Sequence, residues 1–403
     1  MSFLTLFLVL LLFICISSSN GARKTFYGKQ SSIKDDQDGL CALMVQTQGY
    51  PCEEHQVTTK DGYILSMQRI PQGHSSNAKS QSNGIPVLLQ HGLVADAATW
   101  LSSPTNEALG FVLADAGYDV WLSNSRGTNY SSGHTSLSPS DSGYWDWSWD
   151  ELASYDLPAS VQYVHDQTGQ NLHYVGHSLG TLMAFAAFSQ GNVYTMLRSA
   201  GLLSPIAYLG QIRSDLTKAA ADAFIAEDLI WLGINEFAPQ GNSGSKLLKT
   251  ICKLPGIDCS DVMSAVTGPN CCLDSSSVIA QGSQPTSTKN MIHLAQMIRH
   301  GTINMYDYGN EDDNNKHYGQ PNPPAYTMSS ISKDFPLFMS YGGQDYLSDV
   351  DDVHNLLNGD LKDHQSDNLS VLFKDNYAHL DFVHATNAKE QVYDPLMDFF
   401  RSH

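Results

Sequence analysis

A serine between two glycines has the sequence context of an enzymatic nucleophile. Residues 176–180 read Gly-His-Ser-Leu-Gly and follow a short apolar run over 172–175. A serine on a sharp strand-to-helix turn has a strained backbone, and flanking glycines let neighbouring chain approach without Cβ clashes. The motif therefore predicts Ser178 as a nucleophile at the end of a strand, over a helix N-terminus that favours negative charge. An ordinary glycine-rich turn is the alternative.

A serine hydroxyl needs a positioned base, and a carboxylate orients that base in turn. With a nucleophile on this kind of turn, the chain order is Ser, then Asp or Glu, then His. Asp345 follows an apolar run and a Gly-Gly pair, and His379 lies in a loop after the next run. We predict Asp345 and His379 as the partners of Ser178. Their rivals nearby in the chain are Asp349, Asp351 and Asp352 for the acid and His384 for the base.

Ester or amide chemistry at Ser178 also needs an oxyanion hole of backbone N–H donors. We expect one donor from Leu179, directly after the nucleophile, and the other from Leu93, in the loop after an early apolar run. Main-chain groups do this work, so leucine is acceptable at both positions. We interpret His91 as a structural histidine that fixes this loop.

The segments around these residues alternate between strand and helix patterns. Continuous apolar runs are typical of strands buried on both faces, as in parallel sheets. The alternation predicts a βαβ architecture, and together with the serine turn it predicts an α/β-hydrolase fold, a mainly parallel sheet with helices on both faces. The predicted strands are 85–89, 118–122, 172–175, 335–341 and 369–373, and the predicted helices between them are 157–165 and 180–188.

The middle of the chain has amphipathic helical stretches, such as 219–232 and 291–298, which predict an insertion into the core. The densest aromatic cluster, over 144–151, either lines an acyl pocket or packs in the core; we favour packing. We predict four parts: a signal peptide over 1–22, a first part of the hydrolase core over 23–206, a helical cap and lid over 207–332, and a second part of the core over 333–403.

The N-terminus and the cysteines indicate export. An apolar run over 3–16 is too short to span a bilayer, which takes about 20 residues, and small residues follow it. An N-terminal anchor is the alternative. Six cysteines remain beyond the signal and allow fifteen pairings, of which short loops favour Cys41 with Cys52 and Cys252 with Cys259. Sequons predict glycosylation at Asn129 and Asn368.

The charge balance excludes one class of partner. With 22 basic against 41 acidic residues, the net charge of −19 repels phosphates, so we expect no nucleic acid partner. Neither CxxC pairs nor matching histidine spacing indicate zinc, and the acidic stretches 311–313 and 349–352 do not fit a calcium loop. We expect no cofactor and no metal. The oligomeric state stays open.

The chain resembles the acid lipases, which include gastric and lysosomal lipases and their plant counterparts, with plant triacylglycerol lipases as the nearest branch. The resemblance implies Ser178, Asp345 and His379 as a triad, Leu93 and Leu179 at the oxyanion hole, and a lid over an apolar acyl tunnel. One departure is Leu179, where the family usually has Gln; the extra cysteines in the cap are another. The matching motifs lie at 49–51, 53–55, 59–65, 90–93, 124–127, 147–151, 155–159, 341–345 and 379–383.

These observations together predict a secreted or lumenal serine lipase, whether extracellular, vacuolar or lysosomal. Its expected partner is a neutral lipid, triacylglycerol first, at an oil–water or membrane interface, and no transmembrane segment is expected. Alternatives on the same scaffold are a sterol-ester hydrolase, a general carboxylesterase or an acyltransferase. From another class, a lipid-binding protein on an inactive hydrolase scaffold is the rival, and the complete triad speaks against it.

Overall fold

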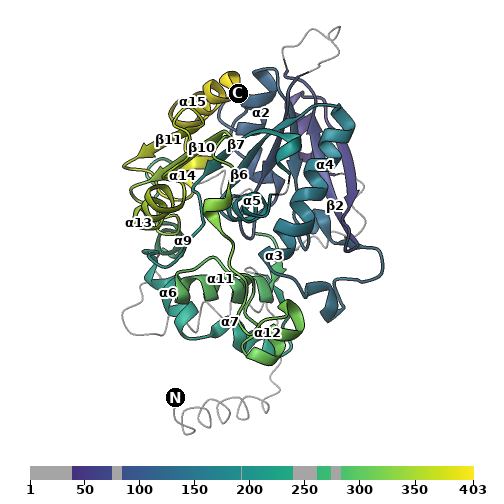
Figure 1. Cartoon of the computed structure of the whole chain (residues 1–403). Helices are drawn as coiled ribbons and strands as arrows, with labels where there is room; N and C mark the ends of the chain where they lie inside the picture. Colours follow the sequence, from purple (N-terminus) through teal and green to yellow (C-terminus); the bar gives the residue numbers. More distant parts are fainter. Residues whose placement is uncertain (1–38, 75–83, 192, 239–260, 274–282) are drawn as a thin grey trace, which may run out of the picture. The chain divides into compact units, whose positions relative to one another are not determined.

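The computed structural model describes residues 39–74, 84–191, 193–238, 261–273 and 283–403. The predicted signal peptide, Cys252 and Cys259 lie outside these residues. The elements described below belong to one compact unit over 38–403 (Figure 1).

A large, mainly parallel sheet forms the centre of this unit, in the order β1-β2-β4-β3-β6-β7-β10-β11, with the short β5 on β2. From β4 to β11 all neighbours are parallel, whereas the β1–β2 and β2–β4 pairs are antiparallel. The predicted strands are confirmed. Their bounds are β1 Glu53–Thr58, β2 Tyr63–Ile70, β3 Pro86–Gln90, β4 Asp119–Ser123, β5 Gly133–His134, β6 Leu172–His177, β7 Leu197–Leu203, β10 Leu337–Gly342 and β11 Leu369–Lys374.

Helices cover both faces of the sheet, as predicted. Along β3 the side chains alternate: Leu88 packs with α4 and α5, while Val87 and Leu89 pack with α2 and α15. Both faces of the sheet are thus buried at its centre, which explains why β3, β4, β6 and β10 read as unbroken apolar runs. The helices around the sheet are α2 Leu109–Asp115, α3 Trp149–Glu151, α4 Leu157–Thr168, α5 Leu179–Ser189, α13 Val350–Asn355, α14 Asp381–His384 and α15 Asp394–Ser402.

A separate group of helices lies between β7 and β10 in the chain, with α11 packed against α6 and α7 (Figure 1). The helix expected over 219–232 is wrong as a single element: it is broken before α7, where Phe224 has a φ of 54°. The cap boundaries at 207 and 332 stay a prediction. The elements are α6 Asp215–Asp222, α7 Ile225–Trp231, α9 Val262–Thr267, α11 Thr288–His300, α12 Glu311–Tyr318 and the two-stranded pair β8 Glu236–Phe237 and β9 Thr286–Ser287.

Two disulfides are present among the described residues. Cys41 is bonded to Cys52, as the short loop predicted, and Cys271 is bonded to its chain neighbour Cys272. The second bond was not among the predicted pairs. No helix in the described ranges has both the length and the apolar character needed to cross a bilayer.

Candidate active site

Ser178 lies on the sharp turn between β6 and α5. Its backbone has φ 56° and ψ −119°, a strained conformation for a residue with a side chain. The flanking glycines are required for steric reasons: a Cβ on Gly176 would lie 2.8 Å from the carbonyl carbon of Gly180, and one on Gly180 would lie 2.6 Å from the carbonyl oxygen of Gln90. The sequence motif thus produces the turn that presents the serine hydroxyl.

The structure brings the other two predicted residues to this hydroxyl. His379, in the loop after β11, has Nε2 2.7 Å from Ser178 Oγ. Its Nδ1 lies 2.9 and 3.0 Å from the carboxylate oxygens of Asp345, in the loop after β10. A carboxylate only accepts, so Nδ1–H donates to Asp345, which leaves Nε2 to accept the serine proton. All three side chains are buried.

The Asp345 carboxylate is held as an anion. Its Oδ1 accepts backbone N–H groups from Leu347 at 2.9 Å and Ser348 at 2.8 Å. Burial raises the pKa of Asp345, but the charge and hydrogen bond of His379 and the two N–H donors outweigh burial and hold that pKa below its usual value.

The rival residues have other positions. Asp349 caps α13, because its Oδ1 accepts the N–H groups of Asp351 and Asp352. Asp352 Oδ2 accepts the Gln211 N–H at 2.9 Å. His384 lies in α14 beyond His379, and burial lowers its pKa to about 4. Asp345 comes directly after the strand, whereas these rivals lie further along the chain, which is the position that favoured Asp345 in the sequence.

Loop 91–93 packs directly on the serine. A Cβ on Gly92 would lie 3.0 Å from Ser178 Cβ, and both Leu93 and Leu179 line the cavity beside Ser178. His91 fixes this loop: its ring bonds the Gly92 carbonyl at 2.8 Å and accepts the Ser125 N–H at 3.1 Å. Burial lowers the pKa of His91 to about 4, so the ring is neutral, which supports a structural role.

Sequence reasoning missed the groups that hold the His379 backbone. The His379 carbonyl accepts Nε2–H of His177 at 3.0 Å and lies 3.3 Å from Ser204 Oγ. Burial, with the nearby His379, lowers the pKa of His177 to about 3, so this ring is a neutral donor. In the sequence, the one sign of this role was that His177 directly precedes the nucleophile.

An apolar cavity of about 390 Å³ opens beside Ser178. Its lining has few polar groups. The aromatic cluster over 144–151 instead packs in the core with α4 and α5, as favoured from the sequence. The cavity is lined mainly by aliphatic side chains of α5, α6, α7 and α11, among them Leu182, Leu216, Ala221, Ile225, Leu294 and Ala295.

The chain is similar in sequence to known lipases. A family model described as a partial α/β-hydrolase lipase region matches residues 41–104, and one described as the α/β hydrolase fold matches 85–200. The chain is 46% identical over 399 residues to triacylglycerol lipase 2 of Arabidopsis thaliana, covering 98% of this chain and 95% of that protein. It is 35% identical to gastric triacylglycerol lipase of Rattus norvegicus, covering 96% and 98%.

A solved structure shows the same fold at low identity. A soluble variant of monoglyceride lipase from Saccharomyces cerevisiae matches with a TM-score of 0.50 and 16% identity, over 87% of this chain and 96% of that one. The extended matches to the lipases, together with this fold, assign the chain. It belongs to the acid lipase family of the α/β-hydrolase fold, close to the plant triacylglycerol lipases.

Proposed function

We propose that this chain is a secreted serine lipase that hydrolyses carboxylester bonds of neutral lipids, triacylglycerols first. The observation that carries the proposal is the hydrogen-bonded series Asp345–His379–Ser178, which ends at the wall of an apolar cavity. Family membership supports ester hydrolysis, and relatives that are triacylglycerol lipases support triacylglycerol as the substrate.

The first half of the reaction forms an acyl-enzyme. Ser178 Oγ attacks the ester carbonyl as His379 Nε2 takes its proton, and the Asp345 carboxylate stabilises the imidazolium that forms. The negative charge that develops on the carbonyl oxygen is accepted by the backbone N–H groups of Leu93 and Leu179. His379 then protonates the leaving alcohol, a diacylglycerol when the substrate is a triacylglycerol.

The second half removes the acyl group by the same route. Water takes the place of the alcohol, His379 accepts a proton from it, and the resulting hydroxide attacks the acyl carbonyl. Collapse of the intermediate returns the proton to Ser178 and releases a fatty acid. No step needs a cofactor or a metal ion, because the base, the nucleophile and the oxyanion donors all come from the chain.

The cavity favours an acyl chain over a charged group. Transfer of hydrocarbon into an apolar site gains about 0.8 kcal/mol per methylene, whereas a buried charge without a partner is costly. The aliphatic lining next to Ser178 therefore suits the acyl part of a lipid, with the polar glycerol side left toward the mouth.

Export is supported by the two disulfides, since such bonds persist in oxidising compartments. Asn129 is exposed and Asn368 is half-buried, so the first is the more accessible of the two proposed glycosylation sites. We therefore infer a secreted or lumenal protein.

The test is a hydrolysis assay on emulsified triacylglycerols, sterol esters and soluble short-chain esters, with Ser178→Ala and the exposed Ser136→Ala as a matched pair. We expect the highest rates on emulsified triacylglycerol, their loss in Ser178→Ala, and full activity in Ser136→Ala, with thermal unfolding nearly unchanged in both. Activity confined to soluble esters, with no rise at an oil–water interface, would favour a general esterase. Turnover retained by Ser178→Ala would refute the mechanism.

A further inference from the structure

One short segment, residues 267–272, is bonded to both loops that carry the partners of Ser178. The Thr267 carbonyl accepts the N–H of His379 at 3.1 Å and that of Tyr346, next to Asp345, at 3.5 Å. Asn270 Oδ1 accepts the Leu380 N–H at 3.0 Å. The segment begins at the last residue of α9, more than 100 positions before His379, so the position of His379 depends on residues far away in the sequence.

Asp381 is the side chain that joins this segment to the His379 turn. Its Oδ2 accepts the N–H groups of Ala378 at 2.8 Å and Cys271 at 3.1 Å, and its Oδ1 accepts the N–H of Cys272 at 3.1 Å. The residue is fully buried. Three backbone donors on one buried carboxylate are charge-assisted hydrogen bonds, which are stronger than neutral ones.

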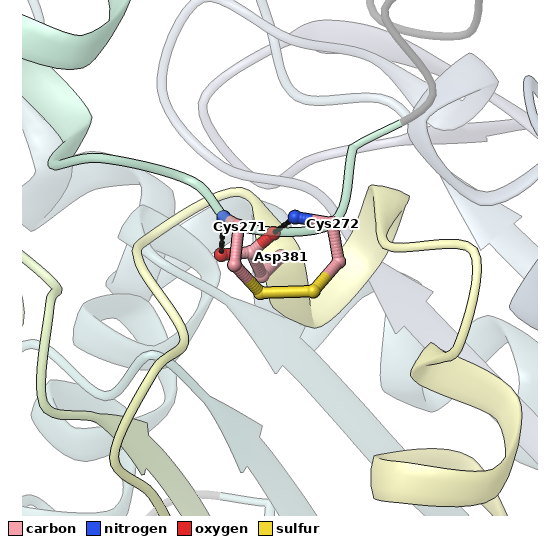
Figure 2. Close-up of side chains that lie close together, drawn as sticks. All are labelled: Cys271, Cys272 and Asp381. Carbon is pink, nitrogen blue, oxygen red and sulfur yellow. Dashed lines mark hydrogen bonds between the residues drawn. A yellow bond between two sulfur atoms is a disulfide. The ribbon is translucent and has the colours of Figure 1, made fainter.

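The Cys271–Cys272 disulfide prepares two of these three donors. Bonding the side chains of adjacent residues closes a small ring through the peptide between them, which restricts its rotation. Figure 2 shows the result: the backbone nitrogens of Cys271 and Cys272 both point toward the Asp381 carboxylate, and the sulfurs lie on the other side of the ring. Because the sulfurs are bonded to each other, neither is a thiolate, so this cluster does not have the ligands of a metal site.

We propose that Asp381 is a positioning residue for the reaction: held by the N–H groups of Ala378, Cys271 and Cys272, it fixes the turn that carries His379, and the disulfide presets the two cysteine donors. The inference rests on the proposed function, because it concerns the same site. Asp381 touches neither Ser178 nor the reacting carbonyl and acts only through His379.

The expected effect follows from how strongly proton transfer depends on geometry. His379 Nε2 lies 2.7 Å from Ser178 Oγ, and a displacement of about 1 Å in such a pair lowers turnover by roughly 100-fold. Substrate binding in the apolar cavity does not involve Asp381. Loss of the Asp381 hydrogen bonds should therefore lower kcat and leave KM nearly unchanged.

The first test is Asp381→Asn, assayed on the ester that the wild-type enzyme turns over best. The amide nitrogen does not accept, so the variant loses at least one of the three hydrogen bonds. We expect kcat to fall roughly 10- to 100-fold, with KM within about threefold. The control is Asp394→Asn, which removes a half-exposed carboxylate bonded to Lys389 and should keep kcat. Rates are normalised to folded protein by circular dichroism, so that a merely structural loss does not lower kcat.

The second test is the double variant C271S/C272S, with C41S/C52S as the control that removes the other described disulfide. We expect the first to lower kcat about 3- to 30-fold and the second to lower only the unfolding temperature. Combining C271S/C272S with Asp381→Asn should lower kcat no further than Asp381→Asn alone, because both act through the same hydrogen bonds.

The outcomes separate this inference from the proposed function. A wild-type protein that hydrolyses no ester refutes the function itself. If the wild type is active, a kcat of folded Asp381→Asn within threefold of wild type, or effects of the two variants that multiply, would overturn the positioning role. If Asp381→Asn does not fold, C271S/C272S decides alone: a kcat equal to that of C41S/C52S overturns the inference, and a selective loss supports it.

Discussion

Replacing Asp345 by Asn tests the proton path more finely than removing the side chain would. Two backbone donors, Leu347 N–H and Ser348 N–H, point at Oδ1, so the amide must keep its carbonyl oxygen there. The NH₂ group then takes the place of Oδ2, 2.9 Å from His379 Nδ1. An amide donor at this position turns Nδ1 into an acceptor and moves the ring proton to Nε2.

The consequence is a histidine with the wrong tautomer. With its proton on Nε2, 2.7 Å from Ser178 Oγ, the ring no longer accepts the serine proton. The imidazolium also loses its anionic partner. We expect kcat/KM to fall about 10³- to 10⁴-fold, which corresponds to about 4 to 5.5 kcal/mol of transition-state stabilisation.

The assay is steady-state hydrolysis of one soluble ester by Asp345→Asn, with Asp351→Asn as the control. Asp351 is exposed on α13, six positions further along the chain, so its variant should stay within twofold of wild type. Both substitutions are nearly isosteric, and calorimetry should show folded proteins. If folded Asp345→Asn keeps more than a tenth of the wild-type kcat/KM, the assignment of Asp345 as the triad carboxylate and of the His379 tautomer is refuted.

Three further predictions concern stability and substrate range. Arg126→Met should lower the free energy of unfolding in chemical denaturation by about 3 to 5 kcal/mol, because it leaves the buried carboxylate of Asp156 unpaired. The control Arg401→Met, at an exposed residue, should have almost no effect. A small loss for Arg126→Met would contradict the role of the ion pair. Burial lowers the pKa of His293 to about 3, so the folded state keeps this ring neutral, whereas the unfolded state takes up a proton below about pH 6.5; stability is therefore lost as the pH falls from 6.5 toward 3. His293→Gln should flatten the pH dependence of the unfolding free energy by about one proton, or about 1.4 kcal/mol per pH unit. An unchanged slope would count against this account. Ala295→Phe should fill part of the cavity and exclude about three methylenes of the acyl chain. At about 0.8 kcal/mol each, this lowers kcat/KM for long-chain esters roughly 60-fold and spares short-chain esters. An equal loss for both kinds of ester would place the acyl chain elsewhere.

The sequence predicted the parts of the site that depend on local geometry. Gly176 and Gly180 are needed because any Cβ there collides with neighbouring backbone, and this restriction is visible as a motif. Asp345 follows the buried β10 and His379 follows its parallel neighbour β11 at the edge of the sheet, and the carboxyl ends of parallel strands meet at one sheet edge. These rules fix which residues meet without knowledge of the rest of the fold.

Features that depend on contacts between distant segments were not predictable in this way. The spacing of the cysteines favoured loop-closing pairs, and a bond between Cys271 and Cys272 depends on the local backbone, which Asp381 holds from another part of the chain. The break at Phe224 interrupts an amphipathic pattern that continues through it, because packing of α6 and α7 against α11 overrides helix propensity. The role of His177 required the His379 loop to be in place.

The central claim is that Ser178 is activated by His379, and covalent labelling tests it most directly. The protein should be incubated with a fluorophosphonate probe, digested and examined by mass spectrometry, beside Ser178→Ala and Ser136→Ala. The account predicts one adduct, on the peptide that contains Ser178, retained in Ser136→Ala and absent from Ser178→Ala. An unlabelled wild-type protein, or an adduct on another serine, would contradict it.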